Sequence, residues 1–354
     1  MTRLLFRTFA LFALLPYAGV VLLLATGRAS WSSIGYVIAI GMLLAGLLTL
    51  PDPERKKRRR PRGISRGAVV AIACVALVRA LFAGHTTGRM QMLDGGDGHP
   101  SLRFVNRLVD EGDVAVAGTR VLVAGGMIAD DRRELPGAMT EAYGAMRDEH
   151  GDVAAPFAAT YLGLERPGAF DLLVIDPPTN DRSVPTDAVI FLHGYAGAFD
   201  LPCWQIARAV DQVTACPATR WVGDWGSAAG EATLRRTVDI LRGRGIERIV
   251  LVGLSNGGYG ASMLAPKMKG MFAGLVLVSG AERDAPAAGI PTLVVHGRHD
   301  TMADYDDSAA YAKRTGAKLV TLEAGHFAML VRGKESDEAL RHFVHERVRA
   351  TASR

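Results

Sequence analysis

The stretch G-L-S-N-G at residues 253–257 decides the fold of this 354-residue chain. It follows the apolar run Arg248–Val252 and precedes a helix that the sequence predicts over Asn256–Leu264. In a G-x-S-x-G turn between a strand and a helix, the serine sits in strained backbone with its hydroxyl exposed, and bulky flanking residues would clash. The pattern therefore predicts Ser255 as a nucleophile at the end of a strand, and not merely a glycine-rich turn.

Six further short apolar runs lie on either side of this turn. Patterns of helical spacing separate several of them, for example over Glu231–Arg242. Short, continuous, apolar runs that alternate with helices are typical of a parallel sheet covered on both faces. We therefore expect an α/β fold with a doubly wound, mostly parallel sheet. The six runs are Phe170–Ile175, Ala188–Leu192, Val213–Ala215, Leu275–Val278, Thr292–Val295 and Leu319–Leu322.

A serine hydroxyl is a poor nucleophile until a base removes its proton. We expect the base to be His326, because it closely follows the run Leu319–Leu322. Asp300 ends the turn after the preceding apolar run, and its carboxylate would orient the imidazole of His326. Asp304, four residues further along, is the alternative acid. The order serine, aspartate, histidine is the one that accompanies this kind of serine turn.

An oxyanion hole requires two backbone N–H groups that converge on the reacting oxygen. One is expected from Asn256, directly after the nucleophile and at the start of a helix. The other is expected from Tyr195, in the loop that follows the run Ala188–Leu192. His193 and Gly194 support that loop, although a plain glycine turn would carry the same residues.

These motifs resemble those of the α/β-hydrolase family over residues 170–350, about half of the chain. The resemblance implies a central, mostly parallel sheet and a two-step acyl-enzyme mechanism. The serine turn is similar to those of esterases, feruloyl-esterase-like enzymes and prolyl-oligopeptidase-type peptidases, so the family alone leaves the substrate open. Many relatives carry a cap before the acid strand, but the short segment Ser279–Pro291 leaves no room for a large one.

The first 84 residues are predicted to form a membrane anchor of about three spans, at 8–26, 31–50 and 67–84. They contain 12 basic and 2 acidic residues, a net charge of +10, whereas residues 85–354 carry 29 and 34, a net charge of −5. The basic surplus is thus confined to one segment, which argues against a nucleic-acid-binding face. The basic loop 51–66 is expected on the cytoplasmic side. A cleaved signal peptide is the alternative for the first stretch.

The remaining segments carry weaker signals. Residues 85–98 are rich in Gly and Asp and are predicted to be a linker, residues 99–166 a partly helical extension and candidate lid, and residues 167–354 the catalytic domain. Cys203 and Cys216 either form a disulfide or are two buried thiols. No Cys-x-x-Cys motif or His/Cys cluster occurs, so neither a metal nor a cofactor is expected.

The sequence thus predicts a membrane-anchored serine hydrolase that cleaves a carboxylic ester, with its catalytic domain outside the cytoplasm. The expected partners are an ester-type small molecule or lipid and the lipid bilayer, and no nucleic acid. An acyltransferase or a peptidase would use the same three residues. A non-catalytic membrane sensor or scaffold with a hydrolase-like domain is the alternative from another class.

Overall fold

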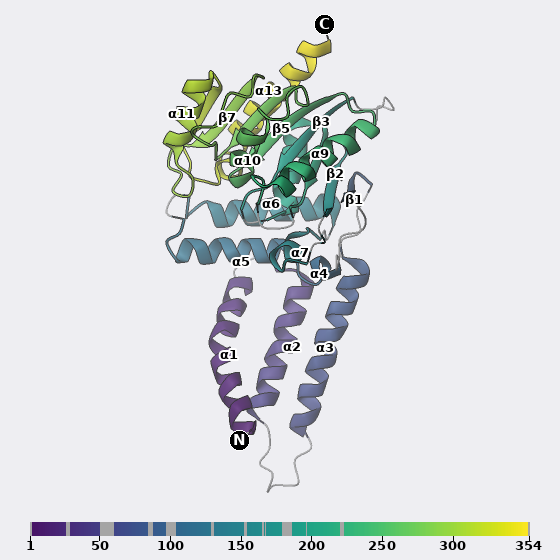
Figure 1. Ribbon diagram of the computed structural model, residues 1–354. Coiled ribbons are helices and arrows are strands. Elements are labelled where there is room, and N and C mark those ends of the chain that lie inside the picture. Colours follow the sequence, from purple (N-terminus) through teal and green to yellow (C-terminus); the bar gives the residue numbers. More distant parts are fainter. Residues whose placement is uncertain are drawn as a thin grey trace.

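Three long helices stand below a layer of shorter helices and a sheet domain in the computed structural model (Figure 1). The structure describes residues 2–25, 29–49, 60–83, 88–96, 104–128, 131–151, 154–164, 166, 168–178, 186–195, 197–219 and 223–352. The three long helices are α1 (Thr2–Ala25), α2 (Trp31–Leu48) and α3 (Arg60–Phe82).

The sheet domain is built on one sheet of eight strands, in the order β1-β2-β4-β3-β5-β6-β7-β8. All neighbours from β4 onward in this order are parallel, whereas β2 is antiparallel to both β1 and β4. The predicted mostly parallel sheet is therefore confirmed. The strands are β1 (Met90–Gly96), β2 (Ala169–Ile175), β3 (Asp187–Leu192), β4 (Val213–Pro217), β5 (Arg248–Leu254), β6 (Gly274–Val278), β7 (Thr292–Gly297) and β8 (Lys318–Leu322).

Helices cover both faces of the sheet. Side chains alternate between the two faces along each strand, so the apolar strands place side chains on both faces and each face needs a cover. In β3, Val189 and Phe191 join the core on one face, and Ile190 and Leu192 join the core on the other. The first core includes α6 (Leu135–His150), α8 (Asp200–Val210), α12 (Ala328–Val331) and α13 (Gly333–Ala352). The second includes α9 (Ala228–Gly243), α10 (Asn256–Leu264) and α11 (Tyr305–Thr315).

The predicted linker over 85–98 is wrong for Met90–Gly96, which form the edge strand β1. The Gly- and Asp-rich composition of this stretch hides a strand that pairs along its whole length with β2. The sheet therefore begins before the extension, and residues 104–164 lie between its first two strands in the sequence. This insertion contributes α4 (Phe104–Arg107), α5 (Glu111–Ala124), α6 and α7 (Phe157–Tyr161).

All seven apolar runs named from the sequence, including the one before the serine turn, are strands, with ends that shift by a few residues. Between β6 and β7 the chain forms turns and no helix, so the predicted absence of a large cap at this position is confirmed.

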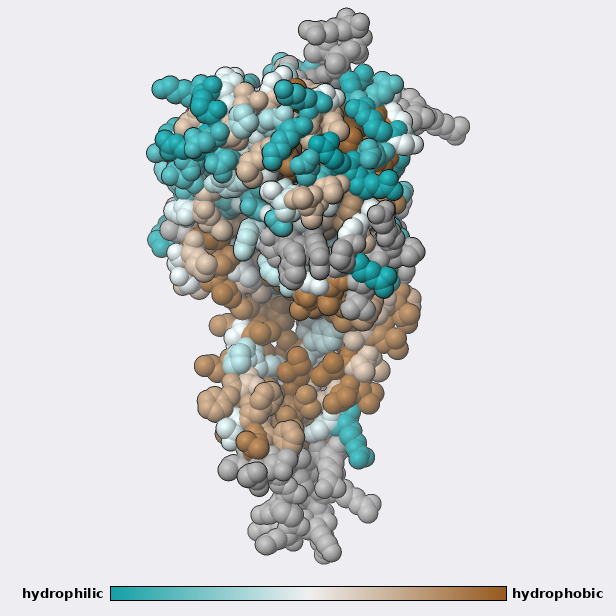
Figure 2. All heavy atoms as spheres, in the orientation of Figure 1, coloured by the Kyte–Doolittle hydropathy of each residue, from teal (hydrophilic) through white to brown (hydrophobic). Residues whose placement is uncertain are grey.

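The three N-terminal helices are long and apolar enough to cross a membrane, over Leu5–Ala25, Trp31–Leu48 and Ile64–Phe82. Figure 2 shows apolar surface gathered on them and on the layer directly above, whereas hydrophilic surface covers the sheet domain. The N-terminal end of α1 and the ends of α2 and α3 next to residues 50–59 lie at the end remote from the sheet (Figure 1). Most of the predicted basic loop, at 51–59, is outside the described residues.

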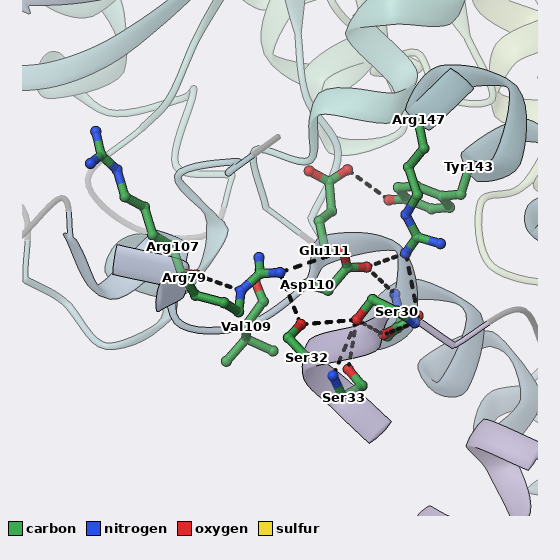
Figure 3. Close-up of polar contacts among 11 residues, drawn as sticks. Ser30, Ser32, Ser33, Arg79, Arg107, Val109, Asp110, Glu111, Tyr143 and Arg147 are labelled. Carbon is green, nitrogen blue, oxygen red and sulfur yellow. Dashed lines mark hydrogen bonds and ion pairs between the residues drawn. The ribbon is translucent and has the colours of Figure 1, made fainter. Parts of the chain in front are cut away.

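A fully buried arginine joins α3 to the layer above it (Figure 3). The Arg79 Nε donates to the carbonyl of Arg107 at 2.7 Å, and its Nη groups donate to Ser32 Oγ at 3.0 Å and to the Val109 carbonyl at 3.2 Å. The Asp110 carboxylate lies 3.9 Å away. Each of the three guanidinium nitrogens of Arg79 therefore donates to an acceptor, and these hydrogen bonds offset the cost of burying the charge.

Asp113 extends this network to the start of α2 (Figure 3). Its carboxylate accepts hydrogen bonds from the N–H of Ser30 at 2.9 Å and from the Ser30 hydroxyl at 2.6 Å. Arg147 of α6 forms ion pairs with both Asp110 and Asp113. Two arginines and two aspartates thus fasten the long helices to the globular part of the chain.

The two cysteines of the globular part form a disulfide in the structure, which settles the alternatives that the sequence leaves open. Cys203 of α8 and Cys216 of β4 have Cα atoms 6.2 Å apart. The bond joins the first turn of α8 to the end of β4, and it closes a loop that contains most of both elements.

We predict that Arg79→Met lowers the thermal stability of the detergent-solubilised protein by several degrees. Breaking a buried ion pair costs about 3–5 kcal/mol, because the partner groups lose their donors without regaining water. Arg66→Met is the matched control, since Arg66 is an exposed arginine of the same helix. Thermal unfolding followed by tryptophan fluorescence measures both variants, and equal midpoints would contradict the described junction.

Candidate active site

Ser255 occupies the turn between β5 and α10 with φ 54° and ψ −120°, in the backbone region that favours glycine. A non-glycine residue there costs about 1–3 kcal/mol, so the surrounding structure must hold it in place. A Cβ on Gly253 would collide with the carbonyl of Gly257, and one on Gly257 would collide with that of Leu192. Both glycines of the pentapeptide are thus required by close backbone packing, as the sequence predicts.

The loop after β3 lies directly against this serine. A Cβ added to Gly194 would lie 3.3 Å from the Cβ of Ser255, so Gly194 allows the two segments to approach. Neither the Tyr195 N–H nor the Asn256 N–H has an acceptor within the described part of the chain. The structure therefore leaves available both N–H groups that the sequence predicts for an oxyanion hole.

His193 holds this loop through both of its ring nitrogens. Its Nδ1 lies 2.8 Å from the carbonyl of Gly194, and its Nε2 accepts from the Thr219 N–H at 3.3 Å. Burial lowers the pKa of His193 to about 4, although the Gly194 carbonyl opposes this shift. The ring is thus neutral at pH 7, with its proton on Nδ1. Trp225 Nε1 also donates to the His193 carbonyl at 2.9 Å.

Asp300 and His326 are brought together on the loops that follow β7 and β8. The Asp300 Oδ2 lies 2.7 Å from the His326 Nδ1, and both side chains are buried. Asp300 Oδ1 accepts the N–H groups of Met302 and Ala303 at 2.8 and 2.9 Å. Burial alone would raise the pKa of Asp300, but hydrogen bonds from His296 and His326 outweigh it and hold that pKa well below its ordinary value.

His296 is a residue of the site that the sequence reasoning missed. Its Nε2 lies 3.0 Å from the same Asp300 oxygen that faces His326, and its side chain is fully buried. The sequence places His296 only in the turn of the acid, since nothing local distinguishes it from the exposed His299 nearby. Asp304, the alternative acid, instead caps α11 by accepting the Asp306 N–H at 2.8 Å.

All these groups lie at one edge of the sheet, because parallel strands end on the same side. Ser255 follows β5, the Tyr195 loop follows β3, and His326 follows β8. The Ser255 N–H donates to the carbonyl of Val278, the last residue of β6, at 2.8 Å. Among the described residues, no group of three His, Cys, Asp or Glu side chains is arranged to hold a metal ion.

Several solved structures resemble the sheet domain. Est1E from Butyrivibrio proteoclasticus is 17% identical, with 51% of this chain and 95% of that chain covered and a TM-score of 0.44. A thermophilic esterase from Thermogutta terrifontis is 20% identical, with 51% and 95% covered and a TM-score of 0.41. XC6422 from Xanthomonas campestris, an α/β serine hydrolase without lid, is also 20% identical, with 51% and 90% covered and a TM-score of 0.41. No family model and no curated protein matches the sequence.

The sheet itself decides the fold. The six strands β3 to β8 are all parallel, helices cover both faces of the sheet, and a strained serine turn joins β5 to α10. This is the α/β-hydrolase fold. Relative to this fold, the three long helices and the insertion between β1 and β2 are additions to the sheet domain.

The helices of the insertion pack in two different places. That residues 99–166 act as a lid remains a prediction. Helices α5 and α6 lie between the long helices and the sheet (Figure 1). Helix α7 lies beside the loop that follows β3, where the rings of Phe157 and Phe199 stack with centroids 5.0 Å apart.

A pair of buried carboxyl groups, those of Glu111 and Asp200, lies at the start of α8, directly after the loop that follows β3. Glu111 Oε1 accepts from the Tyr143 hydroxyl at 2.7 Å and from the Leu201 N–H at 3.1 Å. Burial raises the pKa of Glu111 to about 7, against the lowering effect of these hydrogen bonds. Burial and the neighbouring Glu111 and Asp171 also raise the pKa of Asp200. The insertion and the sheet domain therefore share a site that favours protonated carboxyl groups.

We predict that the folded protein loses stability as the pH rises from about 4.5 to about 7, because Glu111 is protonated there only in the folded state. Glu111→Gln keeps an oxygen for Tyr143 and Leu201 but removes the titration, so its melting temperature should fall less over this range. Glu141→Gln, an exposed change on α6, is the control and should follow the wild type. Identical profiles for all three proteins would show that Glu111 does not titrate as described.

Proposed function

We propose that this chain is a membrane-anchored serine hydrolase that cleaves carboxylic esters through an acyl-enzyme on Ser255. The observation that carries the proposal is the strained serine with two free N–H groups beside it, those of Tyr195 and Asn256, at the sheet edge where Asp300 meets His326. The α/β-hydrolase fold supports hydrolase chemistry only as an analogy, because the fold serves many reactions.

In the first step, the Ser255 Oγ attacks the carbonyl carbon of the ester, and its proton passes to the Nε2 of His326. Asp300 accepts from the Nδ1–H of His326 and stabilises the imidazolium that forms. The hydrogen bonds that keep the Asp300 pKa low support this role, because an ionised carboxylate is required. His296 acts as a positioning residue that holds the Asp300 oxygen from the other side.

The negative charge that develops on the ester oxygen is stabilised by the N–H groups of Tyr195 and Asn256. Donors fixed in place before the reaction need not reorganise during it, and removing one donor from such a site costs about 10²- to 10³-fold in kcat. His193 supports this geometry, because its two ring nitrogens hold the loop that carries Tyr195.

His326 then returns its proton to the departing alkoxide, which leaves as an alcohol and leaves the acyl group on Ser255. A water molecule loses its proton to His326 and attacks the acyl carbonyl, so that a carboxylic acid is released and the serine is regenerated. An acyltransferase would use an alcohol in place of this water, and a peptidase would release an amine in the first step. The same residues serve all three reactions, and hydrolysis of an ester is the simplest.

We propose further that the three N-terminal helices span a membrane and hold the hydrolase domain outside the cytoplasm. The basic stretch 51–66 favours a cytoplasmic position for the α2–α3 connection. The globular domain lies beyond the opposite end of the helices. The Cys203–Cys216 disulfide supports the same placement, since disulfides persist in oxidising compartments.

We predict that a fluorophosphonate probe labels the purified full-length protein and not its Ser255→Ala variant. Ser279→Ala is the matched control and should still be labelled, because Ser279 is a buried serine with positive φ at the end of the next strand. Asp300→Asn should lower kcat for p-nitrophenyl butyrate by about 10³- to 10⁴-fold, by analogy with other serine triads. Equal labelling of wild type and Ser255→Ala would exclude this nucleophile. No labelling of the wild type would favour the non-catalytic scaffold.

We predict that alkaline phosphatase fused after residue 88 is active in bacterial cells, because that enzyme folds only outside the cytoplasm. A fusion after residue 53, in the basic stretch, should be inactive and serves as the control. The reverse pattern would overturn the proposed orientation and leave the hydrolase chemistry untouched.

A further inference from the structure

The edge of the sheet that carries Ser255 faces the long helices through a continuous series of contacts. Gly194 touches the serine, and a Cβ on the nearby Gly197 would lie 3.3 Å from the Tyr161 ring of α7. Helix α7 is tied to α4, because the Ala159 N–H donates to Asn106 Oδ1 at 2.8 Å. Figure 1 shows α4 and α7 between the sheet and the upper ends of α2 and α3.

Two further hydrogen bonds tie α4 to the end of α3. Arg79 Nε donates to the carbonyl of Arg107 at 2.7 Å, and Arg107 Nη1 donates to the carbonyl of Ala80 at 3.1 Å. The two short helices α4 and α7 thus connect the loop beside Ser255 to the end of the apolar helix α3. Because these bonds are buried or partly buried, the domain is held in one orientation above the helices.

Large apolar side chains are exposed on this same layer and on the rim of the site. Between Gly168 and Glu346, only two large apolar side chains among the described residues are exposed, namely Tyr195 at 71% and Met302 at 52%. Both lie on loops of the candidate site, one after β3 and one beside Asp300. We call the exposed large apolar residues of the neighbouring layer the collar. They are Phe104, Val109, Val114, Val121, Met127, Tyr161 and Leu162.

The collar continues the apolar surface of the long helices, as Figure 2 shows for the layer directly above them. Residues 85–354 carry a net charge of −5, yet they expose large apolar side chains on the side next to the long helices. Clustered exposed apolar side chains are typical of a surface that contacts a membrane or another protein. A membrane interface would bury them, as it buries the apolar faces of helices that lie in its plane.

We propose that the collar lies in the interface of the leaflet nearest the domain and that the substrate is a lipid ester of that leaflet. This inference rests on the proposed hydrolase function and names its substrate class. Moving a long acyl chain from the leaflet into water is strongly unfavourable, because every methylene that water surrounds adds to the cost. A nucleophile at the collar avoids most of this cost, since the chain stays in the leaflet while its ester group reaches Ser255.

The test compares two esters with the full-length protein in vesicles of equimolar phosphatidylethanolamine and phosphatidylglycerol. One is p-nitrophenyl acetate, which reaches the site from water, and the other is p-nitrophenyl palmitate embedded in the vesicles. Leu162→Glu places a charge in the collar, so it should lower the rate on the embedded ester about tenfold and leave the rate on the acetate within about twofold. Lys313→Glu, an exposed change on α11 at the opposite edge of the sheet, should alter neither rate.

A second measurement tests whether the collar contacts lipid, and it does not depend on enzyme activity. A nitrobenzoxadiazole label on Leu162→Cys, in a Cys74→Ala background, should be quenched by spin-labelled lipids. The same label on Lys313→Cys should not be quenched. No quenching at residue 162, or equal losses on both esters in Leu162→Glu, would overturn the collar. Loss of fluorophosphonate labelling and of acetate hydrolysis in the wild type would instead overturn the hydrolase itself, so the two failures are distinguishable.

Discussion

The close packing of backbone around Ser255 is the constraint on which the rest of the sheet domain depends. The serine holds a positive φ, which is unfavourable by itself and persists only where neighbouring segments enforce it. A Cβ on Gly257 would strike the carbonyl of Leu192, and one on Gly258 would strike that of Gly280. The strand ends β3 and β6 therefore press on the turn from two sides, and any shift of either strand would release it.

A second constraint acts where the long helices meet the globular part. Buried arginines and aspartates are costly unless each finds partners, and here α2, α3, α5 and α6 all contribute to one network. The partners of Arg79 include carbonyl groups of Arg107 and Val109, which lie at and just after α4. The network thus links the three long helices to the layer that borders the candidate site. The same contacts that fasten the domain therefore also set the position of Ser255 relative to the three long helices.

Local patterns were sufficient for the central strands and for the serine turn. The runs from Phe170 to Leu322 are continuous and apolar because both faces of a parallel sheet are buried, so they stand out without knowledge of their partners. The edge strand Met90–Gly96 does not stand out, because one of its sides has no neighbouring strand and its last residues are Asp and Gly. Its strand conformation depends on pairing with Ala169–Ile175, about 75 residues away in the sequence.

The sequence by itself determined the nucleophile candidate Ser255, the order of Asp300 and His326 after it, and the three apolar helices, because each depends on residues that are neighbours in the chain. Only the tertiary structure decided that His296 shares an oxygen of Asp300, that Glu111 supports the start of α8, and that Arg79 is paired rather than exposed. Hydrogen bonding and desolvation act between groups that folding brings together from distant positions. No local pattern of residue types encodes those distances, and so the orientation of the candidate site toward the three long helices emerges only in three dimensions.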